Sequence, residues 1–329
     1  MADFEEKDIA IERTTHPDAQ WFPDAGMGLF LHWGIHSVAG VQASWAMIQD
    51  YPCAGEKTLT VEEYFALADK FNPQKYDPDR WLAAAYKAGF RYAVLTTKHH
   101  DGYTLWPSEY GDFGVATHLD GRDLVRPYVE ACRKNGIKVG LYFSFVDWRY
   151  PRFPIADVDF DFKKRHQYHP MSKDEDEELF EAFYRYTIGQ IDELLTGYGK
   201  IDLLWFDGAG WKGRDSEALR SRETIRHIRS LQPGIVVNNR WGKVGDYVTP
   251  ECSFPEERPE GWWEACFASG KHWGYSEDPY LLDAPWFAHM RKKCTDWGGN
   301  FLVDVGPAPD GSMSDKFYEV CNELGDRVE

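Results

Sequence analysis

The sequence predicts an α/β fold, a (β/α)8-type barrel in a single domain, and three observations lead to it. Short apolar segments alternate along the chain with longer amphipathic segments. The short segments are almost continuously apolar, as expected for strands buried on both faces of a parallel sheet. The chain also lacks the GxGxxG turn that opens many doubly wound sheets.

Six segments have the composition of buried strands. They are residues 27–33, 92–98, 138–145, 201–207, 235–239 and 300–306. Two weaker candidates, residues 246–251 and 262–268, complete the set that a closed barrel needs, whether regular or irregular. An open, doubly wound sheet is the alternative. It usually has a Gly-rich turn after the first strand, and here that strand ends in His32-Trp33-Gly34.

Helix candidates separate these strands, and several of them end at a glycine suited to a helix C-terminus. They are residues 79–89, 122–136, 178–199, 216–234, 283–299 and 313–328. Strands and helices in this order predict right-handed βαβ units and a parallel sheet. We expect an N-terminal lead-in over residues 1–20 and the barrel domain over 21–329. Within it, an insertion loop near 150–178 carries an acidic run that suits a solvated face or a helix start.

Charge and composition exclude several classes of function. The formal net charge of −17 repels phosphate backbones and anionic membranes, so neither nucleic acid nor a membrane is an expected partner. A neutral polar ligand, such as a sugar, would feel little of this charge. The N-terminus has no basic start or apolar run, and the six cysteines form no CxxC pair. These features predict a cytoplasmic protein with reduced thiols, and they leave a homo-oligomer open.

Polar and aromatic side chains follow the predicted strands. In a parallel barrel the carboxyl ends of the strands meet at one face, where substrates bind. Hydrogen-bonding groups interleaved with aromatic rings suit a polyhydroxylated ligand. The residues expected at this face include His32, His99, His100, Tyr142, Trp205, Asp207, Arg240 and Glu251.

Asp207 is the strongest candidate for chemistry. A carboxylate at the end of a buried strand is costly unless it is paired or used. The alternative is an aspartate that caps the next turn, helped by Gly208. A glycosidase needs a second carboxyl group as acid and base, and Glu251 and Glu264 are both candidates. Spacing alone does not choose between them.

The pair His99-His100 raises the question of a metal. Adjacent residues on a strand point to opposite faces and rarely share an ion, and the chain has no HxH or HExxH spacing. We therefore expect no metal ligand and no cofactor, and interpret the imidazoles as hydrogen-bonding groups for sugar hydroxyls. Without a GxSxG motif, a serine nucleophile has no support.

An ordered set of segments resembles the α-L-fucosidases of glycoside hydrolase family 29, over roughly residues 21–325. The set comprises residues 28–37, 96–103, 140–148, 203–208, 236–242, 273–275 and 298–311, with the segments around Glu251 and Glu264. The resemblance implies a retaining exo-α-L-fucosidase that works by double displacement on a catalytic barrel. It also implies a small-molecule carbohydrate substrate, a fucosylated oligosaccharide or glycoconjugate.

The resemblance also implies roles for individual residues. Asp207 matches the nucleophile and Glu251 the acid/base. Glu264 matches a glutamate of the sugar pocket that is a second candidate for the acid/base. The positions that match fucose-binding residues are His32, Trp45, His99, His100, Tyr142, Trp205 and Arg240.

The sequence departs from the family pattern in two ways. Many members have a glutamate before the pocket tryptophan, whereas here Ser44 precedes Trp45. Typical members also continue into a C-terminal β-sandwich, which has no counterpart in this sequence. Three alternatives stay open: a glycosidase or transglycosidase of different sugar specificity, a non-catalytic sugar-binding barrel, and a metal-dependent barrel hydrolase.

Overall fold

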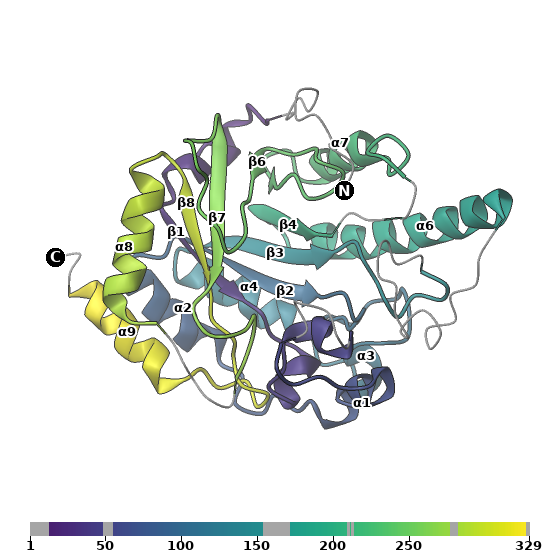
Figure 1. Ribbon diagram of the computed structural model, residues 1–329, viewed down its shortest axis with the longest axis horizontal. Coiled ribbons are helices and arrows are strands. Elements are labelled where there is room, and N and C mark those ends of the chain that lie inside the picture. The colour runs from purple at the N-terminus through teal and green to yellow at the C-terminus, as the bar shows by residue number, and fades with distance from the viewer. Residues whose placement is uncertain are drawn as a thin grey trace.

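The computed structural model describes residues 13–48, 55–153, 172–208, 211, 214–276 and 282–326. Eight parallel strands form one curved sheet in the order β5-β4-β3-β2-β1-β8-β7-β6, which makes a nearly closed barrel (Figure 1). The predicted fold class is therefore confirmed. The strands are β1 (Met27–Leu31), β2 (Tyr92–Lys98), β3 (Lys138–Ser144), β4 (Leu203–Asp207), β5 (Val236–Val237), β6 (Tyr247–Val248), β7 (Trp262–Ala268) and β8 (Asn300–Asp304).

The barrel closes between its two shortest strands, β5 and β6. These strands are joined by a single-residue bridge between Asn238 and Tyr247. The amide N–H of Asp246 donates to the Val237 carbonyl at 2.7 Å, and that of Asn239 donates to the Tyr247 carbonyl at 3.0 Å. We call this junction the β5–β6 seam. Elsewhere the sheet is held by longer parallel ladders, such as that of β2 with β3.

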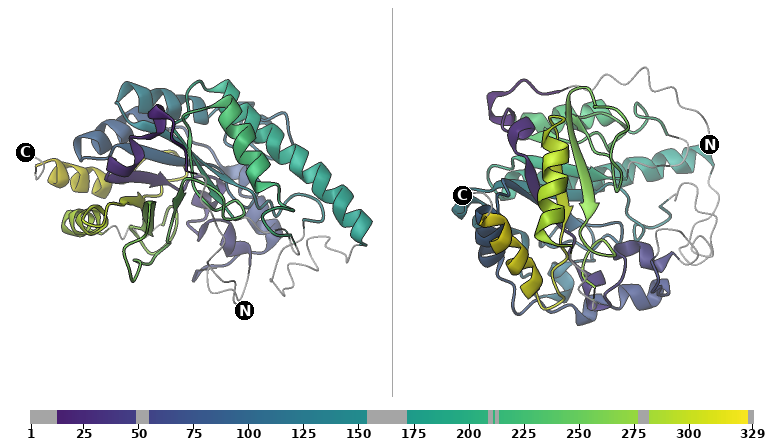
Figure 2. Two further views of the ribbon diagram at one scale, coloured as in Figure 1. Left: turned by 90° about the horizontal axis from the view of Figure 1, so that it is seen from above. Right: turned by 60° about the vertical axis from the view of Figure 1, so that its left-hand side comes forward.

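Helices cover the outside of the barrel. The α-helices are α1 (Val61–Phe65), α2 (Pro78–Lys87), α3 (Val115–His118), α4 (Val125–Lys134), α6 (Lys173–Gly197), α7 (Ser221–Leu231), α8 (Ala284–Thr295) and α9 (Asp315–Gly325). Helix α2 packs against α4 and α9, and α6 packs against α7. Figure 2 shows α8 and α9 side by side, and α8 packs against β8. No helix among the described residues is long and apolar enough to cross a bilayer.

The insertion loop is shorter at its C-terminal end than the sequence predicts. Helix α6 begins at Lys173, because Ser172 and Glu175 form a capping box in which each side chain accepts from the other's backbone N–H. The acidic run is therefore a helix start, one of the two roles expected for it. Residues 154–171 of the predicted loop, and residues 1–12 of the lead-in, lie outside the described residues.

Strand side chains alternate between two hydrophobic clusters. On β1, Leu29 and Leu31 belong to the large cluster that includes the helices, whereas Phe30 belongs to a smaller cluster. The smaller cluster fills the barrel interior and is rich in aromatic rings, among them Tyr142 and Trp205, which stack at 5.5 Å. These two rings also line a pocket, so the packed interior forms the floor of the site.

Candidate active site

A pocket lies at the carboxyl ends of the strands. Most of its lining comes from residues that the sequence placed at strand ends. The lining residues are Phe30, His32, Trp45, His99, Tyr142, Trp205, Asp207, Glu251, Cys266 and Trp273. The structure thus brings together side chains from strands and loops far apart in the sequence.

Asp207 ends β4 and is held by donors on both carboxylate oxygens. Arg240 Nη1 and the Gly208 amide each lie 2.9 Å from Oδ1, and the Tyr142 hydroxyl donates to Oδ2 at 2.9 Å. His100 Nε2 lies 3.6 Å from Oδ2. Burial alone would raise the pKa of Asp207, but these groups, Arg240 above all, hold it below its ordinary value. Asp207 is therefore a carboxylate, the form that a nucleophile requires.

Arg240 connects Asp207 to Glu251. Its Nη2 lies 2.7 Å from Glu251 Oε2, while Nη1 bonds Asp207, so two carboxylates share one guanidinium. The guanidinium also lies over the Trp205 ring at 4.5 Å from its centroid. The Glu251 side chain is 42% exposed and reaches the pocket from the segment after β6.

Glu264 lies deeper than a sugar contact would require. It is fully buried on β7 and is not among the lining residues. Trp205 Nε1 donates to its carboxylate at 2.9 Å, and the Tyr92 hydroxyl donates at 2.5 Å. Burial raises the pKa of Glu264 to about 7. The Glu264 side chain therefore supports Trp205 from below, and direct sugar binding by Glu264 stays a prediction. Of the two acid/base candidates, only Glu251 lies in the pocket with Asp207.

His99 and His100 lie side by side, so the prediction that they point to opposite faces is wrong. Their ring centroids are 4.2 Å apart, and ligand atoms of His99, His100 and Asp207 lie within 4.8 Å of one another. Strand alternation does not apply, because β2 ends at Lys98 and its register with β3 shifts between Thr96 and Lys98. Residue type and distance alone would allow a metal ion here, although each Nδ1 already bonds a serine.

These two serines orient the imidazoles. The Ser144 hydroxyl donates its only proton to the Val146 carbonyl at 2.6 Å, so His100 Nδ1, also at 2.6 Å, must be the donor to Ser144. Burial lowers the pKa of His100 to about 4, so the ring is neutral and Nε2 remains an acceptor. Burial also holds the pKa of His99 well below its ordinary value.

Ser44 is buried and does not line the pocket, although a family glutamate is expected there. Its hydroxyl lies 2.5 Å from His99 Nδ1 and accepts from the Asp101 amide at 3.1 Å. Trp45, the next residue, does line the pocket and packs against His100 with ring centroids 5.4 Å apart. Ser44 therefore supports His99 from outside the pocket lining.

The structure adds three lining residues that sequence reasoning missed. Phe30 points inward on β1, as strand alternation could have indicated. Cys266 is the β7 bridge partner of Glu251. Trp273 packs on His32 at 5.1 Å, and His32 Nδ1 is in turn 2.8 Å from Asp304 Oδ1. Trp273 belongs to the WGY segment of the resemblance, which gave no role for it.

Comparison with known proteins identifies the family of this chain. The family model described as alpha-L-fucosidase matches residues 4–329. The tissue alpha-L-fucosidase of Bos taurus is 32% identical over 94% of this chain and 67% of its own length.

Solved structures of α-L-fucosidases are also similar to this chain. Alpha-L-fucosidase isoenzyme 1 from Paenibacillus thiaminolyticus superposes with a TM-score of 0.83 at 32% identity, covering 95% of this chain and 75% of that one. A trapped covalent intermediate of a Bacteroides thetaiotaomicron alpha-L-fucosidase of family GH29 gives a TM-score of 0.80 at 27% identity, covering 96% and 75%. This chain belongs to the α-L-fucosidase family of glycoside hydrolases, family 29.

Proposed function

We propose that this chain is a retaining exo-α-L-fucosidase that hydrolyses terminal α-L-fucosyl linkages through a covalent fucosyl-enzyme. The observation that carries this proposal is the placement of Asp207 and Glu251 on the two nitrogens of the Arg240 guanidinium, inside one pocket. A retaining glycosidase needs carboxyl groups about 5–5.5 Å apart, whereas an inverting one needs about 6.5–9.5 Å. Sharing one guanidinium favours the shorter separation.

The two carboxyl groups take complementary roles in the proposed reaction. Asp207 Oδ attacks the anomeric carbon while protonated Glu251 gives its proton to the glycosidic oxygen, so the bond to the leaving alcohol breaks as the ester forms. Glu251 then takes a proton from water, which attacks the same carbon and releases Asp207. The relative from Bacteroides thetaiotaomicron has been trapped as a covalent intermediate, and this supports the scheme by analogy.

The pocket suits a single terminal sugar. Tyr142 and Trp205 close its floor, and His32 and His99 offer ring nitrogens on its wall. His100 Nε2 is a neutral acceptor beside Asp207, so it can bond a hydroxyl near the anomeric carbon. A floor closed by stacked rings blocks passage of a chain, which supports exo cleavage of fucosylated oligosaccharides or glycoconjugates.

Release of 4-nitrophenol from 4-nitrophenyl α-L-fucoside tests the proposal. We expect turnover by the wild type, none by Asp207→Ala, and unchanged turnover by the control Asp296→Ala, whose carboxylate pairs with Lys292 on the surface. Azide should rescue Asp207→Ala and give the β-fucosyl azide. Full activity in Asp207→Ala would overturn the assigned nucleophile. A folded wild type that cleaves no fucoside but cleaves another glycoside would favour a different sugar specificity, to which the buried position of Ser44 points.

A further inference from the structure

Lys98 is a buried lysine for which the proposed reaction has no use. Its side chain is 0% exposed at the end of β2, directly before His99. Nζ lies 2.9 Å from Gln190 Oε1 and 3.6 Å from Asp147 Oδ2, and 4.3 Å from the centroid of the Phe143 ring. Taking an ammonium group out of water is costly even when it is paired, so its position calls for an explanation.

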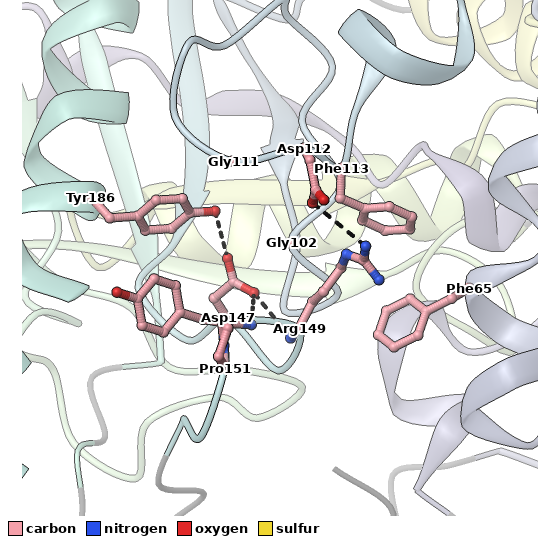
Figure 3. A pocket seen from close by; sticks show the side chains of 10 residues that line it. Phe65, Gly102, Gly111, Asp112, Phe113, Asp147, Arg149, Pro151 and Tyr186 are labelled. Atoms are coloured by element: carbon pink, nitrogen blue, oxygen red, sulfur yellow. Dashed lines mark hydrogen bonds and ion pairs between the residues drawn. The ribbon is translucent and has the colours of Figure 1, made fainter. Parts of the chain in front are cut away.

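Asp147, the counter-ion, organises the segment that follows β3. Its carboxylate is 2% exposed and accepts from the Arg149 and Tyr150 amides at 3.0 and 2.9 Å. The Tyr186 hydroxyl of α6 donates to it at 2.9 Å, as Figure 3 shows. Asp147 therefore fixes the backbone immediately around Trp148.

Trp148 is the link from this network to the sugar pocket. Its amide donates to the His100 carbonyl at 2.7 Å. Its ring lies 5.0 Å from that of His100 and 5.1 Å from that of Trp45, measured between centroids. Lys98 precedes the two histidines, and Asp147 precedes Trp148. The ion pair thus joins the segment after β2 to the segment after β3, next to the residues that contact one another beside the pocket.

We propose that the Lys98–Asp147 ion pair is a positioning element for sugar binding, resting on the proposed function above. It holds the segment after β3 against the segment after β2, so that Trp148 keeps His100 and Trp45 in place. Lys98 touches neither the pocket nor the reacting atoms. It acts through Asp147 and Trp148.

A role in stability alone does not account for the Lys98–Asp147 ion pair. Replacing a buried ion pair by apolar groups is often neutral for stability, so stability alone gives weak reason for this pair. The close fit at Asp147 also argues for a fixed position. A Cβ on Gly102 would lie 2.6 Å from Asp147 Oδ1, and Gly102 has a φ of +78°.

Protonation provides a second measurable property of the pair. Burial lowers the pKa of Lys98 to about 8, and the charges of Asp147 and Asp101 oppose this shift. The other titratable groups nearby are Tyr186 on α6, whose pKa is held well above its ordinary value, and His100. The ion pair is therefore complete below about pH 8 and is lost above it.

The test compares Lys98→Met with Lys138→Met. Lys138 is the control because its ammonium group also pairs with an aspartate, Asp202 at 3.2 Å, but at the amino end of the barrel and with its side chain 39% exposed. We expect Lys98→Met to raise KM for 4-nitrophenyl α-L-fucoside and the Kd for L-fucose about tenfold, as for one or two weakened hydrogen bonds, with kcat changed much less. The wild-type KM should rise above about pH 8, whereas that of Lys98→Met should not.

Folded Lys98→Met with the KM, fucose Kd and pH profile of Lys138→Met would overturn the proposal. If Lys98→Met does not fold, Asp147→Asn decides in its place, because it keeps the shape and removes the charge. Calorimetric fucose binding separates the two proposals. A wild type that binds fucose without cleaving a fucoside refutes the hydrolytic function and still reports on Lys98.

Discussion

Glu264 provides a sharp test of the site, through replacement by glutamine. The carboxyl group is fully buried, and burial raises its pKa from 4.5 to about 7. Below pH 4.5 it is protonated in both the folded and the unfolded chain and contributes nothing to the pH dependence of stability. Between pH 4.5 and 7 the carboxyl group ionises in the unfolded chain but stays protonated in the folded chain, so the free energy of unfolding falls as the pH rises. Above pH 7 ionisation costs the folded chain its full penalty.

The difference between the two pKa values corresponds to a penalty of about 3 kcal/mol above pH 7. Glutamine carries no such penalty, although it exchanges one acceptor for a donor against Tyr92 and Trp205. That exchange changes the free energy of unfolding by the same amount at every pH. The free energy of unfolding of Glu264→Gln minus that of the wild type should therefore rise by about 3 kcal/mol from pH 4.5 to pH 8.

Urea unfolding of both chains between pH 4.5 and 8 measures this difference, because all other titrating groups are common to both and cancel. The exposed Glu260→Gln serves as control and should give a flat difference. A flat difference for Glu264→Gln would refute the assigned environment. The same variant should keep turnover within about tenfold of wild type, since loss of a general acid costs about 10²–10⁴-fold. A larger loss would return Glu264 to the acid/base role.

Two further predictions follow from the packing around the pocket. Ser144→Ala should lower kcat/KM on 4-nitrophenyl α-L-fucoside about tenfold, because His100 Nδ1–H loses its acceptor. The matched control is Ser221→Ala, because the buried Ser221 hydroxyl has no hydrogen-bond partner among the described residues. An unchanged kcat/KM would contradict the inferred His100 tautomer. Gly102→Ala should lower the free energy of unfolding by about 1–3 kcal/mol more than Gly121→Ala, because both glycines have positive φ but only Gly102 faces Asp147. Equal losses in urea unfolding would show that the contact with Asp147 relaxes freely.

The sequence predicted every barrel strand, because strands covered on both faces are apolar along their whole length. It predicted the lengths of β5 and β6 poorly. Segments 235–239 and 246–251 were both expected as strands, yet each forms a ladder of two residues. Ladder length depends on pairing across the seam, which local composition does not contain.

For the site, the rule that strand ends carry chemistry placed Asp207, His32 and His99 correctly in one pocket. Glu264 shows what the rule lacks. Glu264 and Cys266 share the inner face of β7, but Glu264 pairs with Asn300, the first residue of β8, so it lies one layer below the pocket while Cys266 reaches it. Depth along the barrel axis depends on register between strands, which the sequence of one strand does not give.

The β5–β6 seam gives the Arg240–Glu251 ion pair an additional meaning. Arg240 follows β5 and Glu251 follows β6, so this contact spans the place where the backbone ladder is shortest. The Arg240 guanidinium thus connects Asp207 and Glu251 across the seam, while main-chain hydrogen bonds to Cys266 tie the Glu251 segment to β7. Replacing a single side chain around the Arg240 guanidinium can therefore change the spacing of Asp207 and Glu251 and leave the strand ladders of the barrel intact.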